Sequence, residues 1–342
     1  MKRQKYVPLH FDSHNRVAVL AQISTEAQKF FNETIPAGEK LKISVEIDHN
    51  GDVQVFKEES TWGHIARAAG IQMRLNLLVG GYHVRIVDFS KLHQVNTEDL
   101  DRMVDALSLA NGNIALDMMC GYGSLTERIL EVSKKNEISI ELYCADLYLE
   151  QLERIKESVK KQICDIRITD ARCTSYPDNF FDAIAIKMGI HDVPRSDQGL
   201  IFDEAFRILK PGGRLVIWEV LTDRSEEQDA FSAQINKKDE LAGYESFIID
   251  RYFLRSDQVI ALYKNSGFIE VEEVFSAHFS ESSKSRLDSE LHHDPHKLEE
   301  LNQYIRKCTP ENIRASMHYQ DNGESISMTI PNRVFRAIKS VH

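Results

Sequence analysis

One short segment, Ile114–Thr126, limits the possible folds of this chain more than any other. Its apolar run ends in Asp117, and a turn containing Gly121 and Gly123 follows before a helical pattern begins at Leu125. This order predicts a buried strand, a tight loop and a helix N-terminus, the arrangement in which open α/β sheets bind nucleotide-like ligands. Glycine at both loop positions lets a ligand approach the backbone closely.

The alternation of strand and helix continues as far as Val220. Short connections between apolar strands and amphipathic helices predict βαβ units and a parallel sheet that is buried on both faces. The predicted strands are 114–119, 138–145, 163–168, 182–188 and 214–220, and the predicted helices are 125–133, 149–160 and 198–209.

The residues on either side of this core have a different character. The alternating segments 42–47 and 53–56 flank an Asn50-Gly51 turn, which predicts a β-hairpin. A long charged segment, 281–323, is interpreted as helical. The other expected elements are helices at 63–78, 97–109, 223–242 and 255–265 and strands at 268–275 and 326–338, the last interrupted by Pro331.

Composition argues against several classes of protein. The formal net charge of −11 is opposite in sign to the positive charge with which proteins bind nucleic-acid phosphates, so we expect no nucleic-acid partner. No apolar run approaches the roughly 18 residues of a membrane span, and the N-terminus has no apolar signal core, so we expect no membrane partner. The five cysteines lack C-x-x-C spacing, which favours reduced, mostly buried thiols in a cytoplasmic protein.

Polar residues follow four successive predicted strands. Asp117, Asp146, Asp170 and His191 each stand at or just after a strand end. The carboxyl ends of parallel strands meet at one edge of a sheet, so these side chains are expected in one cleft. A carboxylate at Asp146 suits two ribose hydroxyls, and Asp170 with Ala171 is placed to meet an adenine amino group.

In these segments the chain resembles the class I S-adenosylmethionine-dependent methyltransferases. The resemblance covers roughly residues 114–220, and it rests on LDMMCGYGSLT, CADLYLEQL, TDARCTSYPDNFFDAIAIKMGIHDVP and FDEAFRILKPGGRLVIWEV. The last two segments look like the small-molecule branch that contains the quinone-biosynthesis C-methyltransferases. The resemblance implies methyl transfer from S-adenosylmethionine.

The same resemblance implies a role for each residue around the cofactor. Asp117 would orient the methionine part, and Asp146 would hold the ribose. The other implied cofactor-binding residues are Cys120, Gly121, Tyr122 and Gly123 in the loop, Lys187 and Met188 through their backbone, Leu147, Asp170 and Ala171 around the adenine, and Tyr82 closing the pocket.

Two positions bear on the cofactor assignment. The family usually has glycine where this chain has Met119, so the detailed shape of the loop is open here, and a side chain at this position could still point into the core. A dinucleotide fingerprint would need glycine at position 126, where this chain has Thr126, so NAD is the weaker alternative.

His191 is the candidate general base, because an imidazole with an ordinary pKa of about 6.5 suits proton transfer near neutrality. The alternative is a histidine that holds its loop in shape. Glu219, Tyr244 and Tyr252 are further candidate substrate contacts, with turn capping or core packing as their alternatives. His292, His293 and His296 are interpreted as a solvated loop, and no metal site is expected.

We therefore expect an α/β fold with a doubly wound, seven-stranded, mostly parallel sheet and an antiparallel last strand. Residues 1–105 would form a cap or dimerisation region, and 106–342 a core with enclosing insertions at 223–262 and 281–325. The expected function is methyl transfer to an N, O, S or C atom of a small molecule. The alternatives are a tRNA or protein methyltransferase and a non-catalytic cofactor-binding partner subunit. The sequence does not decide between a monomer and a homodimer.

Overall fold

The computed structural model describes two compact units. One contains residues 1–83 with 173–175, and the other contains residues 84–172 and 176–342. The described residues are 96–147, 149–243, 251–291 and 293–341, together with the backbone of five N-terminal strands at 5–12, 17–23, 43–47, 53–58 and 77–81.

The described strands of the N-terminal unit pair in antiparallel fashion. β3 (Ile43–Ile47) pairs with β4 (Val53–Glu58), which confirms the hairpin predicted around the Asn-Gly turn. Leu77 and Leu78 lie in a strand, not in the expected helix, whose other residues are outside the described part. The other three strands, in the sheet order β1-β2-β5, are β1 (Lys5–Asp12), β2 (Val17–Ile23) and β5 (Leu77–Gly81).

The larger unit is built on one sheet, whose strands follow the predicted alternation. Its strands are β6 (Ile114–Met118), β7 (Glu141–Asp146), β8 (Asp165–Ile168), β9 (Phe181–Lys187), β10 (Leu209–Val220), β11 (Phe268–Ser282), the short β12 (Gln320–Asp321) and β13 (Ile326–Lys339).

Seven of these strands lie in the order β11-β13-β10-β9-β6-β7-β8, and β12 pairs with β13. Neighbours from β10 to β8 are parallel, whereas β13 runs antiparallel to both β10 and β11. This topology confirms the predicted mostly parallel sheet with an antiparallel last strand.

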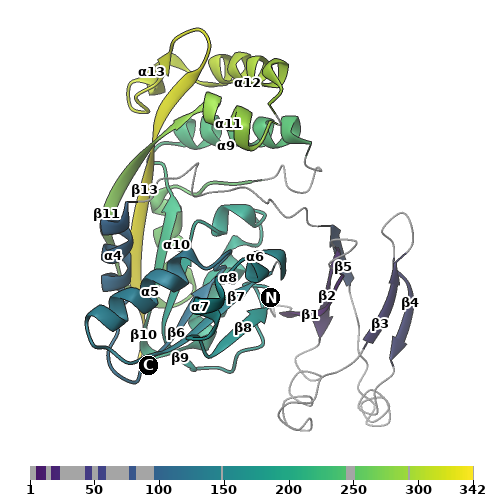
Figure 1. Ribbon diagram of the computed structural model, residues 1–342, viewed down its shortest axis with the longest axis vertical. Helices are drawn as coiled ribbons and strands as arrows, with labels where there is room; N and C mark the ends of the chain where they lie inside the picture. The colour runs from purple at the N-terminus through teal and green to yellow at the C-terminus, as the bar shows by residue number, and fades with distance from the viewer. Residues whose placement is uncertain are drawn as a thin grey trace. The chain divides into compact units, whose positions relative to one another are not determined.

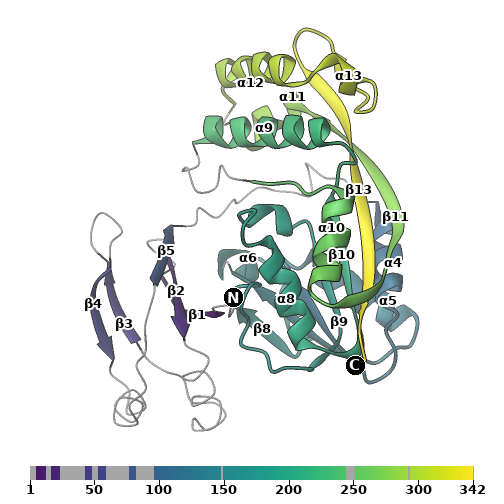
Figure 2. The same cartoon turned by 180° about the vertical axis from the view of Figure 1, so that it is seen from behind.

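Helices cover both faces of this sheet (Figures 1 and 2). α8 (Gln198–Ile208) and α10 (Ser256–Asn265) pack on one face against Leu116, Ile184 and Ile217. The opposite face carries α4 (Thr97–Ala106) and α5 (Ser124–Lys135), which pack against residues such as Ala115, Ala183 and Val216. Because the strands are buried on both sides, they appear in the sequence as nearly continuous apolar runs.

α4 is part of the core unit, although the expected domain boundary fell between residues 105 and 106. Its side chains Met103 and Val104 are fully or almost fully buried, in one cluster with Leu125 and Ile129 of α5. The apolar stripe of α4 therefore helps to cover the sheet, and the compact unit begins at residue 84.

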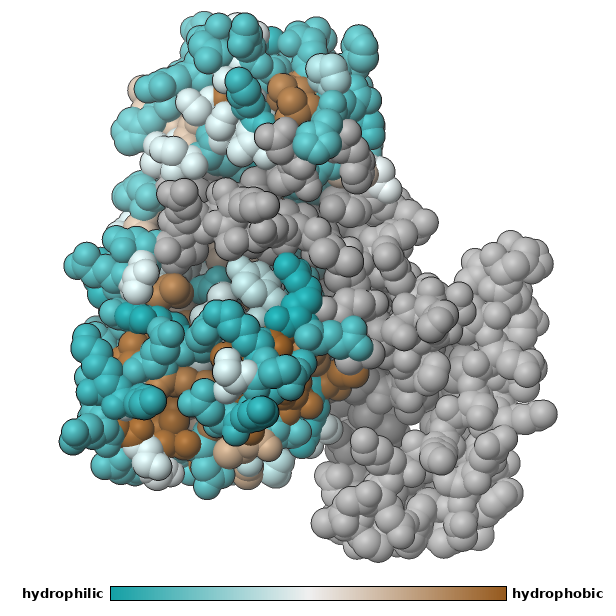
Figure 3. Space-filling model, in the orientation of Figure 1, coloured by the Kyte–Doolittle hydropathy of each residue, from teal (hydrophilic) through white to brown (hydrophobic). Residues whose placement is uncertain are grey.

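A layer of helices lies beyond the carboxyl ends of the parallel strands (Figures 1 and 2). The long strands β11 and β13 extend from the sheet into this layer, which has its own core of residues such as Phe231, Ile305 and Met328. Its surface is largely hydrophilic in the view of Figure 3. The helices of this layer are α9 (Ser225–Ala242), α11 (Ser283–Ser289), α12 (Pro295–Cys308) and α13 (Glu311–Arg314).

Two expected elements differ in detail. The helix predicted at 149–160 is two short helices, α6 (Leu149–Glu153) and α7 (Glu157–Lys160), because Lys156 is extended between them. Pro331 does not interrupt β13. Its carbonyl accepts a hydrogen bond from the amide of Leu221 just beyond the end of β10, so the missing proline N–H lies where no ladder partner is required.

The cysteines and the histidine-rich segment also follow local structure. Cys120, Cys144 and Cys173 are buried as expected, but Cys164 is exposed and Cys308 is half-buried. In the histidine-rich segment, Asp294 caps α12, its carboxylate accepting hydrogen bonds from the amides of His296 and Lys297, while His292 lies outside the described residues. None of the described helices is both long and apolar enough to cross a membrane.

Candidate functional site

The loop after β6 brings backbone amides to the carboxyl edge of the sheet. Gly121 and Gly123 have φ angles of +54° and +82°, in the left-handed region that favours glycine. The Gly121 amide donates to a carboxylate oxygen of Asp146 at 2.8 Å, which joins the ends of β6 and β7. A side chain at position 123 would meet Ile155 at 3.1 Å, so the break between α6 and α7 places Ile155 against this loop.

Asp117 is buried at the end of β6, with 1% of its surface exposed. One carboxylate oxygen accepts a hydrogen bond from the hydroxyl of Thr126 at 2.6 Å, and the other has no hydrogen-bond partner among the described residues. Burial raises the pKa of Asp117 to about 7. Thr126 therefore hydrogen-bonds the Asp117 carboxylate, and it does so from the position where a dinucleotide fingerprint would need glycine.

The next two strand ends carry the residues assigned to ribose and adenine. Asp146 is 8% exposed at the end of β7, and the adjoining Leu147 is half-buried. Asp170, after β8, is held by Arg172, whose backbone amide donates at 2.8 Å and whose guanidinium donates at 2.7 Å. Ala171 is buried beside it.

Met119 takes the left-handed conformation expected of a glycine, with φ +63°. Its side chain packs against the core cluster of Leu116 and Ile186, the orientation that the sequence left open. It also occupies the space beside Gly189, where an added Cβ would lie 3.0 Å from the Cβ of Met119. Gly189 thus accommodates the methionine.

His191 and Glu219 form a buried pair at the ends of two neighbouring strands. His191 lies in the short 3-10 helix η1 (Ile190–Asp192) after β9, and Glu219 lies near the end of β10. Nδ1 of His191 is 2.7 Å from one carboxylate oxygen of Glu219, whose other oxygen accepts from the Ile190 amide at 2.7 Å. This arrangement favours the tautomer with the proton on Nδ1.

Other groups fix the orientation of the imidazole. The ring of Phe253 stacks on that of His191, with ring centroids 4.6 Å apart and planes inclined by 18°. Asp192 lies 3.7 Å from Nε2, and its carboxylate is held by Arg251 at 2.5 Å.

Lys187 ends β9 between the strands that carry Asp117 and Glu219. It is half-buried, and it makes no hydrogen bond within the described part of the chain. Burial lowers the pKa of its ammonium group, against the opposing effect of the two carboxylates. The next residue, Met188, has φ +58°, and its amide donates to the Trp218 carbonyl.

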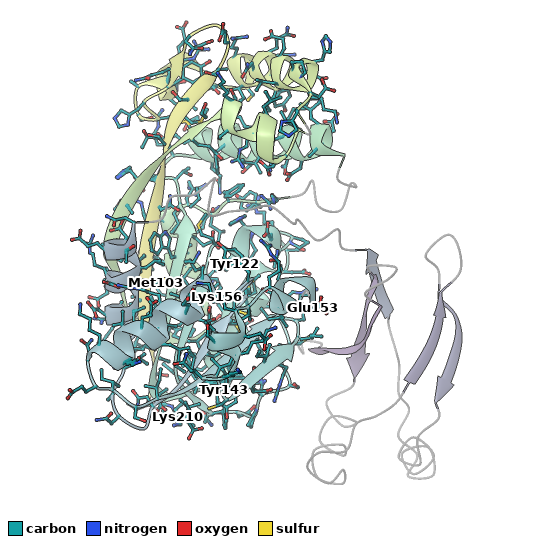
Figure 4. The ribbon with its side chains drawn as sticks, in the orientation of Figure 1. Met103, Tyr122, Tyr143, Glu153, Lys156 and Lys210 are labelled. Atoms are coloured by element: carbon teal, nitrogen blue, oxygen red, sulfur yellow. The ribbon has the colours of Figure 1, made fainter. Side chains whose placement is uncertain are left out.

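The remaining predicted site residues are not all brought together. The ring of Tyr122, which is labelled in Figure 4, lies beneath the guanidinium of Arg154, whose carbon is 5.1 Å from the ring centroid. The hydroxyl of Tyr252 accepts from Gln258, and its ring lies beneath Arg195, so its side chain is engaged by neighbouring residues. Tyr82 and Tyr244 lie outside the described residues.

A buried ionic network above the strand ends was not predicted from the sequence. Lys238 of α9, 2% exposed, lies 2.5 Å from Glu290 and 2.7 Å from Asp239. Arg286 binds the other oxygen of Glu290 at 2.6 Å, and Arg251 lies 3.5 Å from Asp239. Charged residues on a helix are usually solvated, so the residues of α9 carry no signal for this burial.

Comparison with known proteins agrees with this geometry. Residues 116–217 match the family described as "Methyltransferase domain". The chain is 30% identical over 117 residues to the ubiquinone/menaquinone biosynthesis C-methyltransferase of Hydrogenovibrio crunogenus, a match to 34% of this chain and 45% of that protein. It is 31% identical over 144 residues to the protein of that name from Yersinia pestis, covering 40% and 55%. The chain thus spans about half the length of the curated relatives it matches.

A solved structure shares the fold. YcgJ from Bacillus subtilis aligns with a TM-score of 0.61 and 13% identity, over 72% of this chain and 99% of that chain. At this identity the likeness shows the fold alone.

Proposed function

We propose that this chain, whose residues 116–217 match the methyltransferase-domain family, is a class I S-adenosylmethionine-dependent methyltransferase and that it methylates a small molecule that must lose a proton. The observation that carries the proposal is the His191–Glu219 pair at 2.7 Å, which stands at the carboxyl ends of β9 and β10. The glycine loop after β6 lies at the same edge of the sheet, where open α/β folds bind their ligands.

The residues at this edge fit the cofactor. The Asp146 carboxylate at the end of β7 would accept from the ribose hydroxyls, while it keeps its bond to Gly121. A Cβ at Gly121 would meet nothing within 4 Å, so a ligand has room beside this part of the loop. Asp117 offers a buried oxygen, unsatisfied by the described residues, to the methionine end. When bound, S-adenosylmethionine supplies a methyl group that its sulfonium already activates.

The protein's part in the reaction is then alignment and removal of a proton. Nδ1–H of His191 would donate to Glu219, and Nε2 would be the nitrogen that takes the proton from the methyl acceptor. Glu219 stabilises the imidazolium that forms, and it acts through His191 because both of its oxygens already accept bonds from the protein. Stacking on Phe253 keeps the ring in place.

This chemistry favours acceptors with an acidic proton, such as a phenol or the activated carbon of a hydroquinone. A thioether acceptor has no proton to lose and would make the pair unnecessary. The names of the matched relatives, C-methyltransferases of ubiquinone and menaquinone biosynthesis, support an acceptor of the first kind.

The test combines cofactor binding with turnover. His191→Ala should keep the wild-type affinity for S-adenosylmethionine and lose methyl transfer to a phenolic acceptor by about 10²–10⁴-fold, the usual range for a general base. Asp146→Ala should lose cofactor affinity itself. Unchanged turnover in His191→Ala would contradict proton abstraction, and absence of cofactor binding by the wild type would support the partner-subunit alternative.

A further inference from the structure

We propose that the side-chain ammonium of Lys187 binds the amino-acid carboxylate of the methyl donor. This inference rests on the proposed function, since it names a contact with that cofactor. It goes beyond the backbone contact expected for Lys187 by assigning the side chain a charge partner.

The position of Lys187 in the sheet places it on the cofactor side of the site. Ala183 and Ala185 of β9 pack in the same cluster as α4 and α5, and Lys187 follows two residues later, on the same face by strand alternation. Asp117 lies on this face of the neighbouring strand β6 too, because it follows Ala115 by two residues. Lys187 and Asp117 therefore lie on the same face of the sheet, on neighbouring strands, and Asp117 acts on the charge of the lysine.

Both groups lack part of their bonding. The Lys187 ammonium makes no hydrogen bond with the described residues, and one oxygen of Asp117 is buried without a partner among them. Buried and half-buried charges are costly unless they are paired and hydrogen-bonded. A zwitterionic amino acid would satisfy both, because its ammonium can donate to Asp117 and its carboxylate can accept from Lys187.

The chemistry of the surroundings favours a carboxylate for Lys187. The carboxylates of Asp117 and Glu219 both act on its charge. Glu219 is committed to His191 and the Ile190 amide, and Asp117 to Thr126, so neither carboxylate is bonded to the lysine. A carboxylate from the ligand would complete the charge balance, and a charge-assisted hydrogen bond is the stronger kind.

The experiment compares two ligands that differ by one group. S-adenosylmethionine and its decarboxylated analogue both carry the sulfonium and the amine, and only the first carries the carboxylate. Calorimetric titration of Lys187→Met should show S-adenosylmethionine binding weakened about tenfold or more, the effect of losing a hydrogen bond between charged groups. The decarboxylated analogue should bind the variant at least as tightly as it binds the wild type.

Lys210→Met is the matched control. It removes the same charge from a lysine that pairs with Asp182 at 2.8 Å, at the opposite end of the sheet from Tyr122 (Figure 4), so both affinities should stay at wild-type values. Lys187→Arg, which keeps the charge, should retain most of the preference for the carboxylate, and thermal unfolding of each variant checks that it is folded.

Four results would overturn the inference. If Lys187→Met weakened the binding of both ligands equally, the lysine would act as a counter-ion of Asp117 and not as a partner of the ligand carboxylate. Unchanged affinity for S-adenosylmethionine with a raised KM for the acceptor would assign Lys187 to the acceptor. If the wild type bound neither ligand, both this inference and the proposed function would be contradicted. If the wild type bound the two ligands equally tightly, this inference alone would be contradicted.

Discussion

Glu219 holds two donors at once: the Ile190 amide on one carboxylate oxygen and Nδ1 of His191 on the other, each at 2.7 Å. The amide can only donate, so it fixes which end of any replacement side chain faces the histidine. The Glu219 carboxylate thus selects the imidazole tautomer of His191.

Glu219→Gln should therefore reverse that tautomer. The glutamine oxygen would accept from the Ile190 amide, and its NH₂ group would donate to Nδ1, which moves the imidazole proton to Nε2. Turnover of a phenolic acceptor should fall by about 10²-fold or more, without a change in cofactor affinity. Nitrogen NMR of the His191 ring reports the tautomer directly. Glu204→Gln, which alters a buried glutamate paired with Arg207 on α8, should leave the tautomer unchanged.

Met119 and Gly189 should be energetically coupled. Gly189→Ala would bring a methyl group to 3.0 Å from the Cβ of Met119, and overpacking of this kind costs about 1–3 kcal/mol of unfolding free energy. The cost should disappear in a Met119→Gly background, because that variant removes the Cβ concerned. Urea unfolding of the four proteins in this cycle measures the coupling, and additive effects of the two substitutions would show that the contact is unimportant.

The buried Asp117 predicts a specific pH dependence of stability. Its pKa is raised from 3.8 to about 7, so the folded state keeps a proton that the unfolded state releases. Its contribution is fully present below about pH 4 and is lost as the pH rises towards 7. The loss reaches about 4 kcal/mol at most, from about 1.4 kcal/mol per unit of pKa.

Asp117→Asn is the variant that tests this pH dependence. An asparagine cannot ionise, and its oxygen can still accept from Thr126. The stability of the variant relative to the wild type should rise between pH 4 and pH 7, as measured by urea unfolding at several pH values. A constant difference across that interval would mean that Asp117 is ionised in the folded protein throughout.

Lys238 should be among the most sensitive residues of the helical layer. Lys238→Met would leave Glu290 without the ammonium at 2.5 Å and Asp239 without the one at 2.7 Å, and breaking a buried pair costs about 3–5 kcal/mol. Replacing Glu290 by leucine in the same protein should recover part of this loss. Lys237→Met, which changes an adjacent lysine whose partners Glu240 and Glu300 are both exposed, should cost less than about 1 kcal/mol.

Local sequence patterns predicted the core of this protein well. The strands from β6 to β10 follow apolar runs, and the loop around Gly121 and Gly123 follows from residues that are adjacent in sequence. The four polar strand-end residues, Asp117, Asp146, Asp170 and His191, could be expected in one cleft because parallel strands bring their carboxyl ends to one edge, whereas the roles of the other candidate cofactor residues rest on the family resemblance.

Contacts between distant segments could not be predicted in the same way. Glu219 and His191 are 28 residues apart, and the sequence suggested a substrate contact or a turn cap for the glutamate, not a partner for the histidine. The ionic network of Lys238 and Glu290 joins residues 52 positions apart, and the sequence alone favours solvated side chains for both.

The sequence by itself determined the order of the elements, the glycine loop and the set of polar residues at the strand ends, because hydrophobic period and turn chemistry are local properties. Only the tertiary structure decided which charges are buried and paired. Burial depends on what the helical layer and the neighbouring strands place around a side chain, and the cost of an unpaired buried charge then fixes its partner. Hence the imidazole tautomer, the raised pKa of Asp117 and a Lys187 ammonium that makes no hydrogen bond with the described residues are properties of the folded chain.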